Sequence, residues 1–461
     1  MLQAFINTLK VKDLRNRLMF TALIIVLVRF ASSVPCPGVD PGALGRFMSE
    51  LSAGSSDDGG VMAFIDLFSG GALTHFALGA LGIMPYITAS IIVQLLVPVV
   101  PSLEKITRDG ATGQQKISQY TRYLTIVVCV VQGLMVALAM INPTKIGLPQ
   151  PSEPLYQGNT QVFLLMTVLV LTTTTMVFTW LGEQITERGI GNGVSLIITI
   201  NIISRLPQAV IELVQMAWAG HTPDGTSFRT VQLLLLLVVF CVVTAATIML
   251  SEGYRRVPIQ MIRKAVGKQM TGGATYMPLK VNFANVMPII FAGAILMFPE
   301  YLFRYFASKP DASPIWNSLA QSFMNGGVAY MVTYGILILA FSFFWVANQF
   351  NPIQIADNLK KEGAFIPGIS PGQPTADFLD TAMTRVTAGG AIFLLVLALF
   401  PMFLYSSFKI PFIVAQFFGG TSLLIMVGVV LDTVSQLESH LTMRHYEGFL
   451  KSGRLRGRSG N

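Results

Sequence analysis

The chain has 461 residues, of which 52% are hydrophobic and only 12% are charged. Because soluble domains carry about 25% charged residues, this composition excludes an ordinary soluble protein and predicts a polytopic membrane protein. Lys and Arg outnumber Asp and Glu by 31 to 23, so the net charge is +8. The three cysteines, Cys36, Cys129 and Cys241, lie far apart and indicate neither a disulfide framework nor a zinc site.

The N-terminal region combines basic residues with a short apolar run, Leu18–Val28. This pattern is shared with signal peptides, but no small-x-small cleavage site follows it. An uncleaved first membrane span is therefore expected. A span needs about 20 mostly apolar residues, and ten candidates follow in chain order. They lie at roughly 17–32, 77–98, 119–141, 161–181, 190–210, 231–251, 284–303, 327–348, 387–406 and 410–431.

The distribution of Lys and Arg predicts the orientation. Most of them lie at the N-terminus, in the segments after even-numbered spans and in the tail at 437–461. Since cytoplasmic loops carry the excess of basic residues, both termini are expected in the cytoplasm, as ten spans require.

The stretch Phe68–Leu96 is predicted to be a broken element. It opens with Gly70, Gly71 and a weakly apolar segment that carries His75, and it continues as an apolar run that contains Pro85. Broken helices at membrane depth are tolerated where the freed backbone faces protein or a water-filled cavity. We therefore expect this stretch to face a cavity.

A weak internal repeat relates the second and seventh predicted spans. Met84–Ile92 aligns without gaps on Met287–Ile295, with Met, Pro, Ile and Ala at equal positions. Two five-span halves would have opposite topology, and inverted repeats place the working site at their interface near the membrane midplane. The halves are expected at 1–215 and 216–461, although chance similarity between apolar segments is the alternative.

Catalytic and coupling chemistry is hard to find. The predicted spans are nearly free of ionisable residues, which disfavours a proton- or sodium-coupled pump. The glycine-rich loop Gly189–Gly193 is best explained as punctuation between helices. Glu183 and Glu187 could share a helix face, and a solvated face beside Arg188 explains them without a site. The four histidines show no metal spacing, so no metal, cofactor or enzymatic activity is expected.

Two long loops on the cytoplasmic side, 251–283 and 350–386, are the remaining polar features. The first is basic and rich in glycine, and the second contains four prolines. Long structured loops are usually functional. A basic tip could dock on RNA phosphates or on an acidic protein, while retention of topology is the simpler explanation.

Six ordered motifs resemble the SecY family of the bacterial protein translocase over essentially the whole chain. They are FSGGALTHFALGALGIMPYITASII, WLGEQITERGIGNGVSLII (Trp180–Ile198), YMPLKVNFANVMPIIFA (Tyr276–Ala292), NPIQIADNLKKEGAFIPGISPG, FFGGTSLLIMVGVVLDT (Phe417–Thr433) and MRHYEGFLKSGRLRGR. The resemblance implies an all-α clamshell channel of ten helices in the cytoplasmic membrane. Its lateral gate would lie between spans two and three and spans seven and eight. The implied partners are SecE, SecG, the SecA motor, a translating ribosome, signal peptides, nascent chains and membrane lipid.

The resemblance also implies roles for individual residues. The pore ring would consist of five isoleucines: Ile87, Ile91, Ile198, Ile290 and Ile425. Such a ring gates by dewetting and offers no hydrogen bond that favours one passing sequence over another. Any one of these isoleucines alone could be ordinary lipid-facing filler. Ile87 and Ile290 also occupy the same position of the internal repeat.

A plug is implied at about 63–79, and its members include Phe68, Gly70, Gly71, Leu73 and His75. The glycine pair is expected to let it swing. Partner docking is implied for seven basic loop residues: Arg255, Arg256, Arg263, Lys264, Lys268, Lys360 and Lys361. Two positions that are often arginine in bacterial relatives are Ile353 and Ser370 here, so motor contacts there would depend on other residues.

The sequence thus favours a channel that passes unfolded polypeptides and releases hydrophobic segments sideways into lipid. A secondary solute transporter with inverted repeats is the alternative from another class, and the near absence of buried charge argues against it. An insertion scaffold without a conducting path would not need the isoleucine ring.

Overall fold

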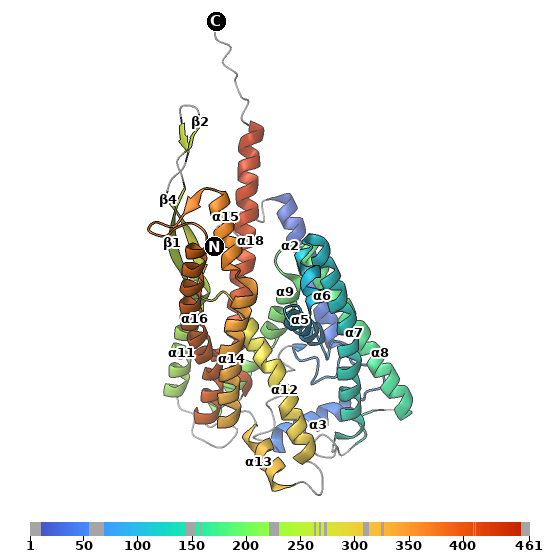
Figure 1. The fold of residues 1–461 in the computed structure, drawn as a ribbon. Coiled ribbons are helices and arrows are strands. Elements are labelled where there is room, and N and C mark those ends of the chain that lie inside the picture. The colour runs from blue at the N-terminus through green and yellow to red at the C-terminus, as the bar shows by residue number, and fades with distance from the viewer. Residues whose placement is uncertain are drawn as a thin grey trace.

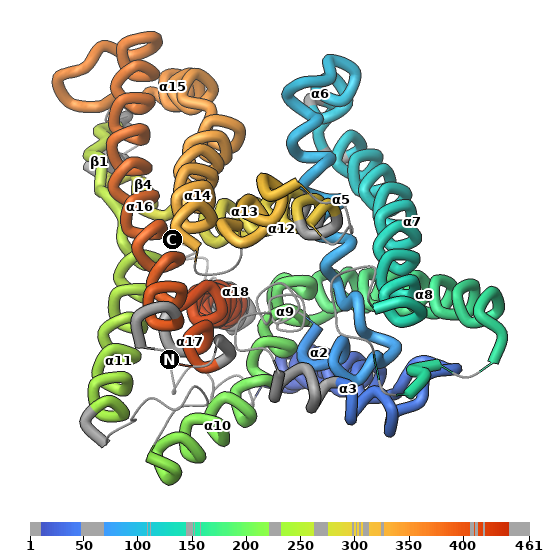
Figure 2. The backbone as a smooth tube through the Cα atoms, turned by 90° about the horizontal axis from the view of Figure 1, so that it is seen from below, coloured from blue at the N-terminus to red at the C-terminus, as the bar shows by residue number. Residues whose placement is uncertain are grey.

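The computed structural model describes residues 11–54, 69–143, 151, 153–156, 158–220, 230–261, 264–266, 269–271, 274–307, 313–323, 327–408, 410 and 412–452. Most of these residues form helices that run along a common axis (Figure 1). Viewed along that axis, α5, α6, α7 and α8 lie on one side and α11, α14 and α16 on the other, with α9, α17 and α18 between them (Figure 2).

The first half of the chain is helical between short turns. Its elements are α2 (Lys12–Ser33), α3 (Pro41–Gly54), α5 (Met84–Leu96), α6 (Pro101–Arg108), α7 (Ala111–Ile141), α8 (Thr160–Arg188), α9 (Gly193–Ser204) and α10 (Leu206–Ala219). Asparagines begin two of them: the side chains of Asn159 and Asn192 accept bonds from backbone N–H groups of the first turns of α8 and α9. Helices α5, α7 and α8 pack side by side in that order.

The second half combines helices with strands. Its elements are α11 (Thr230–Glu252), β1 (Tyr254–Met261), β2 (Lys264–Val266), β3 (Gln269–Thr271), β4 (Ala274–Lys280), α12 (Met287–Ala307), α13 (Pro314–Ser322), α14 (Val328–Gln349), α15 (Pro352–Lys361), β5 (Ala364–Phe365), α16 (Gln373–Phe408), α17 (Phe412–Gly419) and α18 (Thr421–Ser452). Helices α12, α14 and α16 pack in sequence. Contacts between the halves are made mainly where α9 meets α18 and α10 meets α17.

Seven helices in the described part of the chain are long and apolar enough to cross a membrane. Met84–Leu96 and Pro101–Thr107 pass the same test only together, with a bend of 102° between them, and Met287–Leu296 is a shorter apolar helix. Helix α2 has the length of a span, but its basic first turns and Arg29 make it more polar. A largely helical membrane protein is therefore confirmed, while the count of ten spans stays a prediction.

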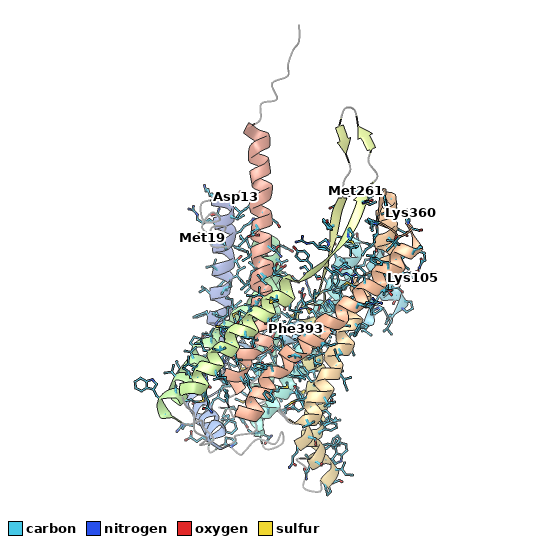
Figure 3. All side chains as sticks on the ribbon, turned by 90° about the vertical axis from the view of Figure 1, so that its left-hand side faces the viewer. Asp13, Met19, Lys105, Met261, Lys360 and Phe393 are labelled. Atoms are coloured by element: carbon cyan, nitrogen blue, oxygen red, sulfur yellow. The ribbon has the colours of Figure 1, made fainter. Side chains whose placement is uncertain are left out.

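The two long polar loops form one sheet, which the sequence did not indicate. Strand β1 pairs antiparallel with β4 from Tyr254↔Lys280 to Gln260↔Ala274, and its end pairs with β5 through Met261↔Ala364. This sheet projects from the same end as α15 and the C-terminal part of α18 (Figure 1). Asp13, Lys105, Met261 and Lys360 all lie toward that end (Figure 3), whereas α3 and α13 lie at the other.

The second and tenth predicted spans differ from expectation. Residues 70–83 form turns, so the helix expected from 77 begins only at Met84, where Pro85 suits a first helical turn. The preceding backbone instead bonds to the chain after α2, with Cys36 N–H donating to the Phe76 carbonyl at 2.8 Å. The stretch expected as one span at 410–431 is divided at Gly420 into α17 and α18. A Cβ at Gly420 would lie 2.6 Å from Pro401, so the close packing there requires glycine.

Other boundaries also depend on tertiary packing. The fifth predicted span is interrupted between α9 and α10 at Arg205. Helix α10 runs through position 215, so the expected boundary between halves falls inside a helix, and the division into halves stays a prediction. The basic tail is largely a continuation of α18, which extends to Ser452.

Candidate functional site

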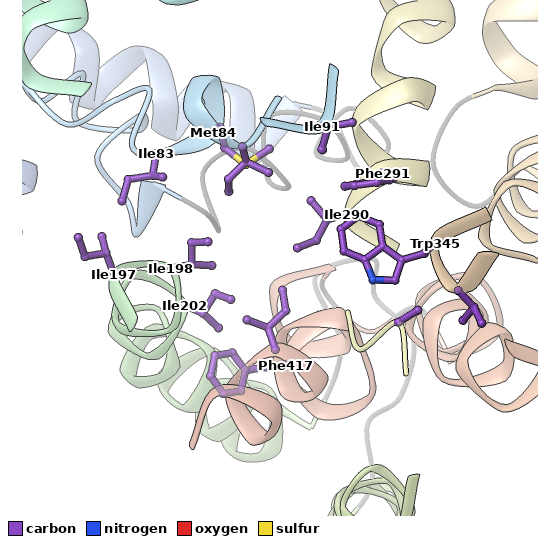
Figure 4. Close-up of a cluster of buried hydrophobic side chains, with 14 of the residues drawn as sticks. Ile83, Met84, Ile91, Ile197, Ile198, Ile202, Ile290, Phe291, Trp345 and Phe417 are labelled. Atoms are coloured by element: carbon purple, nitrogen blue, oxygen red, sulfur yellow. The ribbon is translucent and has the colours of Figure 1, made fainter. Parts of the chain in front are cut away.

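Five isoleucines from both halves of the chain meet in the centre of the molecule. Ile87 and Ile91 come from α5, Ile198 from α9, Ile290 from α12 and Ile425 from α18. All five belong to one cluster of buried hydrophobic side chains and are no more than 8% exposed. Ile91, Ile198 and Ile290 point into this cluster from three helices in Figure 4. The structure therefore places all five isoleucines in one buried apolar cluster, and their arrangement as a ring stays a prediction.

Helix geometry explains how α5 and α12 present these side chains. Ile87 and Ile91 are four residues apart and so lie on one face of α5. Helices α5 and α12 both begin at the methionine of a Met-Pro pair, so Ile87 and Ile290 are each the fourth residue of their helix. The internal repeat thus corresponds to two helices that start alike and contribute isoleucine at the same position.

Several members of the apolar cluster were missed by sequence reasoning. Ile83, Ile197, Ile202 and Phe417 belong to the same cluster and lie on the side of Ile198 (Figure 4). Ile202 is fully buried and lies one helical turn beyond Ile198, and that spacing could have identified it. On the side of α12 and α14, the rings of Phe291 and Trp345 meet edge to face at 5.3 Å between centroids.

The aliphatic side chains of this cluster are suited to form a barrier to ions. Branched aliphatic side chains carry no group that could replace the hydration shell of an ion, so a narrow passage lined by them opposes ions by dewetting. Different rotamers of isoleucine and methionine can widen such a passage without breaking a hydrogen bond. Met84, which is 8% exposed, adds a flexible member beside Ile83 (Figure 4).

The segment before α5 is closely packed at its described residues. Gly70 and Gly71 have φ values of +67° and +91°, and Leu73 is buried, whereas His75 is exposed. Backbone bonds of 2.7–3.0 Å, including Ala77 N–H to the Ala72 carbonyl, hold it in consecutive turns. Phe68 and residues 63–67 of the expected plug lie outside the described residues.

Polar residues of α2 and α9 contact this segment. Both terminal nitrogens of Arg29 donate to the Gly70 carbonyl at 3.3 Å, and Arg29 Nη1 also donates to Asn201 Oδ1 at 3.4 Å. Arg205 Nη2 donates to Thr74 Oγ1 at 3.1 Å. In the sequence, Arg29, Asn201 and Arg205 are isolated polar residues within or beside apolar runs. The sequence could not show that they converge on the glycine pair.

Two carboxylates correct the expected pattern of charge. Glu183 has a partner after all, because Arg122 of α7 donates to both of its oxygens at 3.0 and 2.7 Å. Glu300 lies inside the seventh predicted span and is only 7% exposed, so the spans are less free of ionisable residues than expected. Glu300 follows Pro299 near the end of α12, where a run of aromatic residues masks its polarity in the sequence.

The expected docking residues fall on the projecting sheet and on α15. Arg255 and Arg256 are exposed on β1, and the Arg256 guanidinium lies 5.3 Å from the centroid of the Tyr254 ring. Lys360 and Lys361 are exposed at the C-terminal end of α15, which precedes β5. Because β5 pairs with β1, both loops carry their charges on one projection. Arg263 and Lys268 lie outside the described residues, and Lys264 belongs to β2.

The two departures from the bacterial motif lie on the same projection. Ile353 is 56% exposed at the start of α15. Ser370 is exposed, and its carbonyl accepts a bond from the Thr375 hydroxyl at 2.9 Å. Neither position provides a positive charge, which leaves Lys360 and Lys361 as the cations of α15.

Comparison with known proteins places this arrangement in a family. A family model described as SecY matches residues 77–434. The chain belongs to the SecY family. Protein translocase subunit SecY of Chlamydia trachomatis is 40% identical over 456 residues, which cover 97% of this chain and 98% of the relative. The SecY proteins of Haemophilus influenzae and Mycobacterium tuberculosis are 39% and 40% identical over 96% and 98% of this chain.

Solved structures share the SecY fold. A structure titled as a protein conducting channel superposes with a TM-score of 0.58 at 16% identity and covers 96% of this chain and 94% of its own. A study of the SecY plug domain in the closed channel gives 0.56 at 17% identity with the same coverage. Sec61 in the canine ribosome-channel complex gives 0.54 at 15% identity, again over 96% of this chain and 94% of its own. At these identities the likeness supports the fold alone.

Proposed function

We propose that this chain is the channel subunit of a protein translocase in the cytoplasmic membrane. It passes unfolded secretory polypeptides across the membrane and releases hydrophobic segments sideways into lipid. The observation that carries this proposal is the cluster of five buried isoleucines, contributed by four helices from both halves of a SecY-family chain. Segment 69–83 acts as part of the plug, next to the ring.

The lateral gate is proposed at the seam between α5 and α7 on one side and α12 and α14 on the other. Closer helix packing between the halves occurs elsewhere, between α9 and α18 and between α10 and α17. A seam with fewer backbone contacts separates at lower cost, because less buried surface is lost on opening. The energy for transport comes from a bound partner, the SecA motor or a translating ribosome, and SecE and SecG complete the complex.

Passive ion leak tests the ring. Ile87→Asn and Ile290→Asn place an amide that holds water in the apolar constriction, so we expect each to raise the leak of vesicles reconstituted with the protein. The matched control is Val131→Asn on α7, which lies outside the apolar cluster and is 53% exposed. An unchanged leak in both isoleucine variants would remove the ring from the proposal.

A further inference from the structure

The glycine pair before α5 lies between Arg29 of α2 and Arg205 of the junction between α9 and α10. The Gly70 carbonyl accepts bonds from both terminal nitrogens of Arg29, and it accepts a third from the Ser204 hydroxyl at 3.2 Å. Four residues further on, the Thr74 hydroxyl accepts from Arg205 Nη2. Residues 70–74 thus form hydrogen bonds with α2, with α9 and with the junction between α9 and α10.

Burial of the two guanidinium groups increases the energetic importance of these hydrogen bonds. Arg29 is half-buried, and Arg205 is only 8% exposed. A guanidinium inside a membrane protein needs acceptors, because an uncompensated charge there is strongly unfavourable. Arg205 also donates to Gln208, so its acceptors are divided between its own helix region and the segment. If the segment left its place, both cations would lose an acceptor.

Glycine is required at this point for proximity. A Cβ at Gly70 would lie 2.5 Å from Arg29 Nη1, and one at Gly71 would lie 3.0 Å from Arg205 Cζ. Both residues also have positive φ values, which residues other than glycine rarely adopt. The sequence suggested that the pair lets a plug swing; the structure shows that it lets the backbone approach two cations.

We propose that Arg29 and Arg205 are positioning residues that latch the plug segment in the closed channel. This inference rests on the proposed channel function. Arg29, Arg205 and the plug segment all belong to the N-terminal half of the chain. The latch therefore holds the segment against helices of its own half. Opening must replace charge-assisted hydrogen bonds, which are stronger than neutral ones, by bonds to water. The latch therefore raises the free energy that binding of an arriving polypeptide must supply to displace the plug.

Accessibility of the segment provides the test. Ala72 is fully buried between the two contacts. In full-length protein whose native cysteines are replaced, Ala72→Cys is labelled with an impermeant maleimide added to the face of the membrane opposite the basic loops. Loss of one charged hydrogen bond is expected to raise the labelling rate about tenfold or more in Arg29→Gln and Arg205→Ala. The control is Arg46→Ala, because Arg46 pairs with Glu153 at 2.7 Å outside the latch.

A double-mutant cycle separates a latch from a general loosening of the fold. If Arg205 acts through Thr74, Thr74→Val should add little to the labelling rate once Arg205→Ala is present. Fully multiplicative effects of the two changes would contradict the latch. So would unchanged labelling in both arginine variants that keep the melting temperature of the parent.

The same vesicles distinguish failure of the latch from failure of the channel. Transport of a secretory reporter by the parent protein tests the proposed function independently of labelling. Transport combined with unchanged labelling would overturn the latch alone. Absence of transport with all partners supplied would overturn the proposed function.

Discussion

At the scale of residues, position within a helix decides what each side chain does. Isoleucine is common throughout the apolar helices, but Ile87 and Ile290 are each the fourth residue after a Met-Pro start and point into the same cluster. By contrast, Val242 on α11 is 62% exposed although its side chain is equally apolar. Hydropathy alone cannot separate these residues, whereas an equivalent place in two related helices can.

Cys36 offers a residue-scale prediction outside the spans. Burial raises the pKa of its thiol to about 11. The thiolate is the reactive form, so raising the pKa from 9.0 lowers its fraction at pH 8 about a hundredfold. We expect maleimide labelling of Cys36 in the folded protein to be correspondingly slow and to keep rising between pH 9 and pH 11.

Mass spectrometry of the labelled protein at several pH values measures this reactivity. The matched reference is Cys36 in the same protein after unfolding, where the thiol is solvated. A labelling rate that reaches its plateau near pH 9 in the folded protein would contradict the burial of Cys36.

At the scale of elements, the loop Gly189–Gly193 joins the two halves at the end that carries the basic loops. It separates α8 from α9, as expected, and it also packs between α2 and α18. The Gly191 N–H donates to Gln436 of α18 at 3.1 Å, and the Ile190 N–H donates to Thr21 of α2 at 3.4 Å. The loop therefore fixes the geometry of the helix that carries Ile198.

Gly193→Ala tests this close packing. A Cβ there would lie 1.9 Å from the Gly182 carbonyl oxygen, so the backbone of α8 or α9 must shift. We expect the free energy of unfolding to fall by about 2 kcal/mol or more. Thermal unfolding of the purified protein in detergent measures the effect.

Gly389→Ala in α16 is the matched control, since a Cβ there meets nothing within 4 Å. Alanine is favoured over glycine in helices by about 1 kcal/mol, so this variant should be as stable as the parent or more so. Equal melting temperatures for Gly193→Ala and the parent would show that α8 and α9 can move apart at this contact without loss of stability.

At the scale of the whole molecule, the proposed function assigns the predicted ring and the basic projection to different steps of one process. The ring residues come from both halves and lie in the core of the bundle, whereas the projection is built only from the second half and lies at one end. A passing chain would meet the ring, and a cytoplasmic partner would meet the projection. The two regions can therefore be tested separately.

Site-specific cross-linking tests the path of the polypeptide. Photoreactive residues in place of Ile87, Ile198, Ile290 and Ile425 should label a stalled secretory chain, because all four side chains lie in the central cluster. The same probe at Val131 or Val242, which are exposed and lie outside the cluster, should label lipid. Labelling of the secretory chain from the outer positions alone would contradict a central channel.

Charge reversal tests the basic projection. Because β5 pairs with β1, reversal at Arg255 and Arg256 and reversal at Lys360 and Lys361 should each weaken the same binding event. We expect about tenfold weaker binding of the SecA motor or the ribosome to reconstituted vesicles, with a smaller dependence on salt. Arg46→Glu, at the other end, is the control. Unchanged affinity in both charge-reversal variants would favour the simpler explanation, that these basic residues only maintain the membrane topology.

By itself the sequence determined the membrane character and the approximate helix positions, and through its resemblance to the SecY family it predicted which isoleucines form a ring. Membrane character and helix positions follow from local hydropathy and from helix-breaking residues such as Pro85, while the repeat supports only Ile87 and Ile290 of the predicted ring. Only the tertiary structure decided that Arg29 meets Gly70 and Asn201, which are 41 and 172 positions away. It also decided that Arg122 pairs with Glu183, that β5 joins β1, and that residues 70–83 form turns. The physical reason is that helix formation and insertion into a membrane depend on residues close in sequence, whereas the partner of a buried polar group depends on which helices pack together.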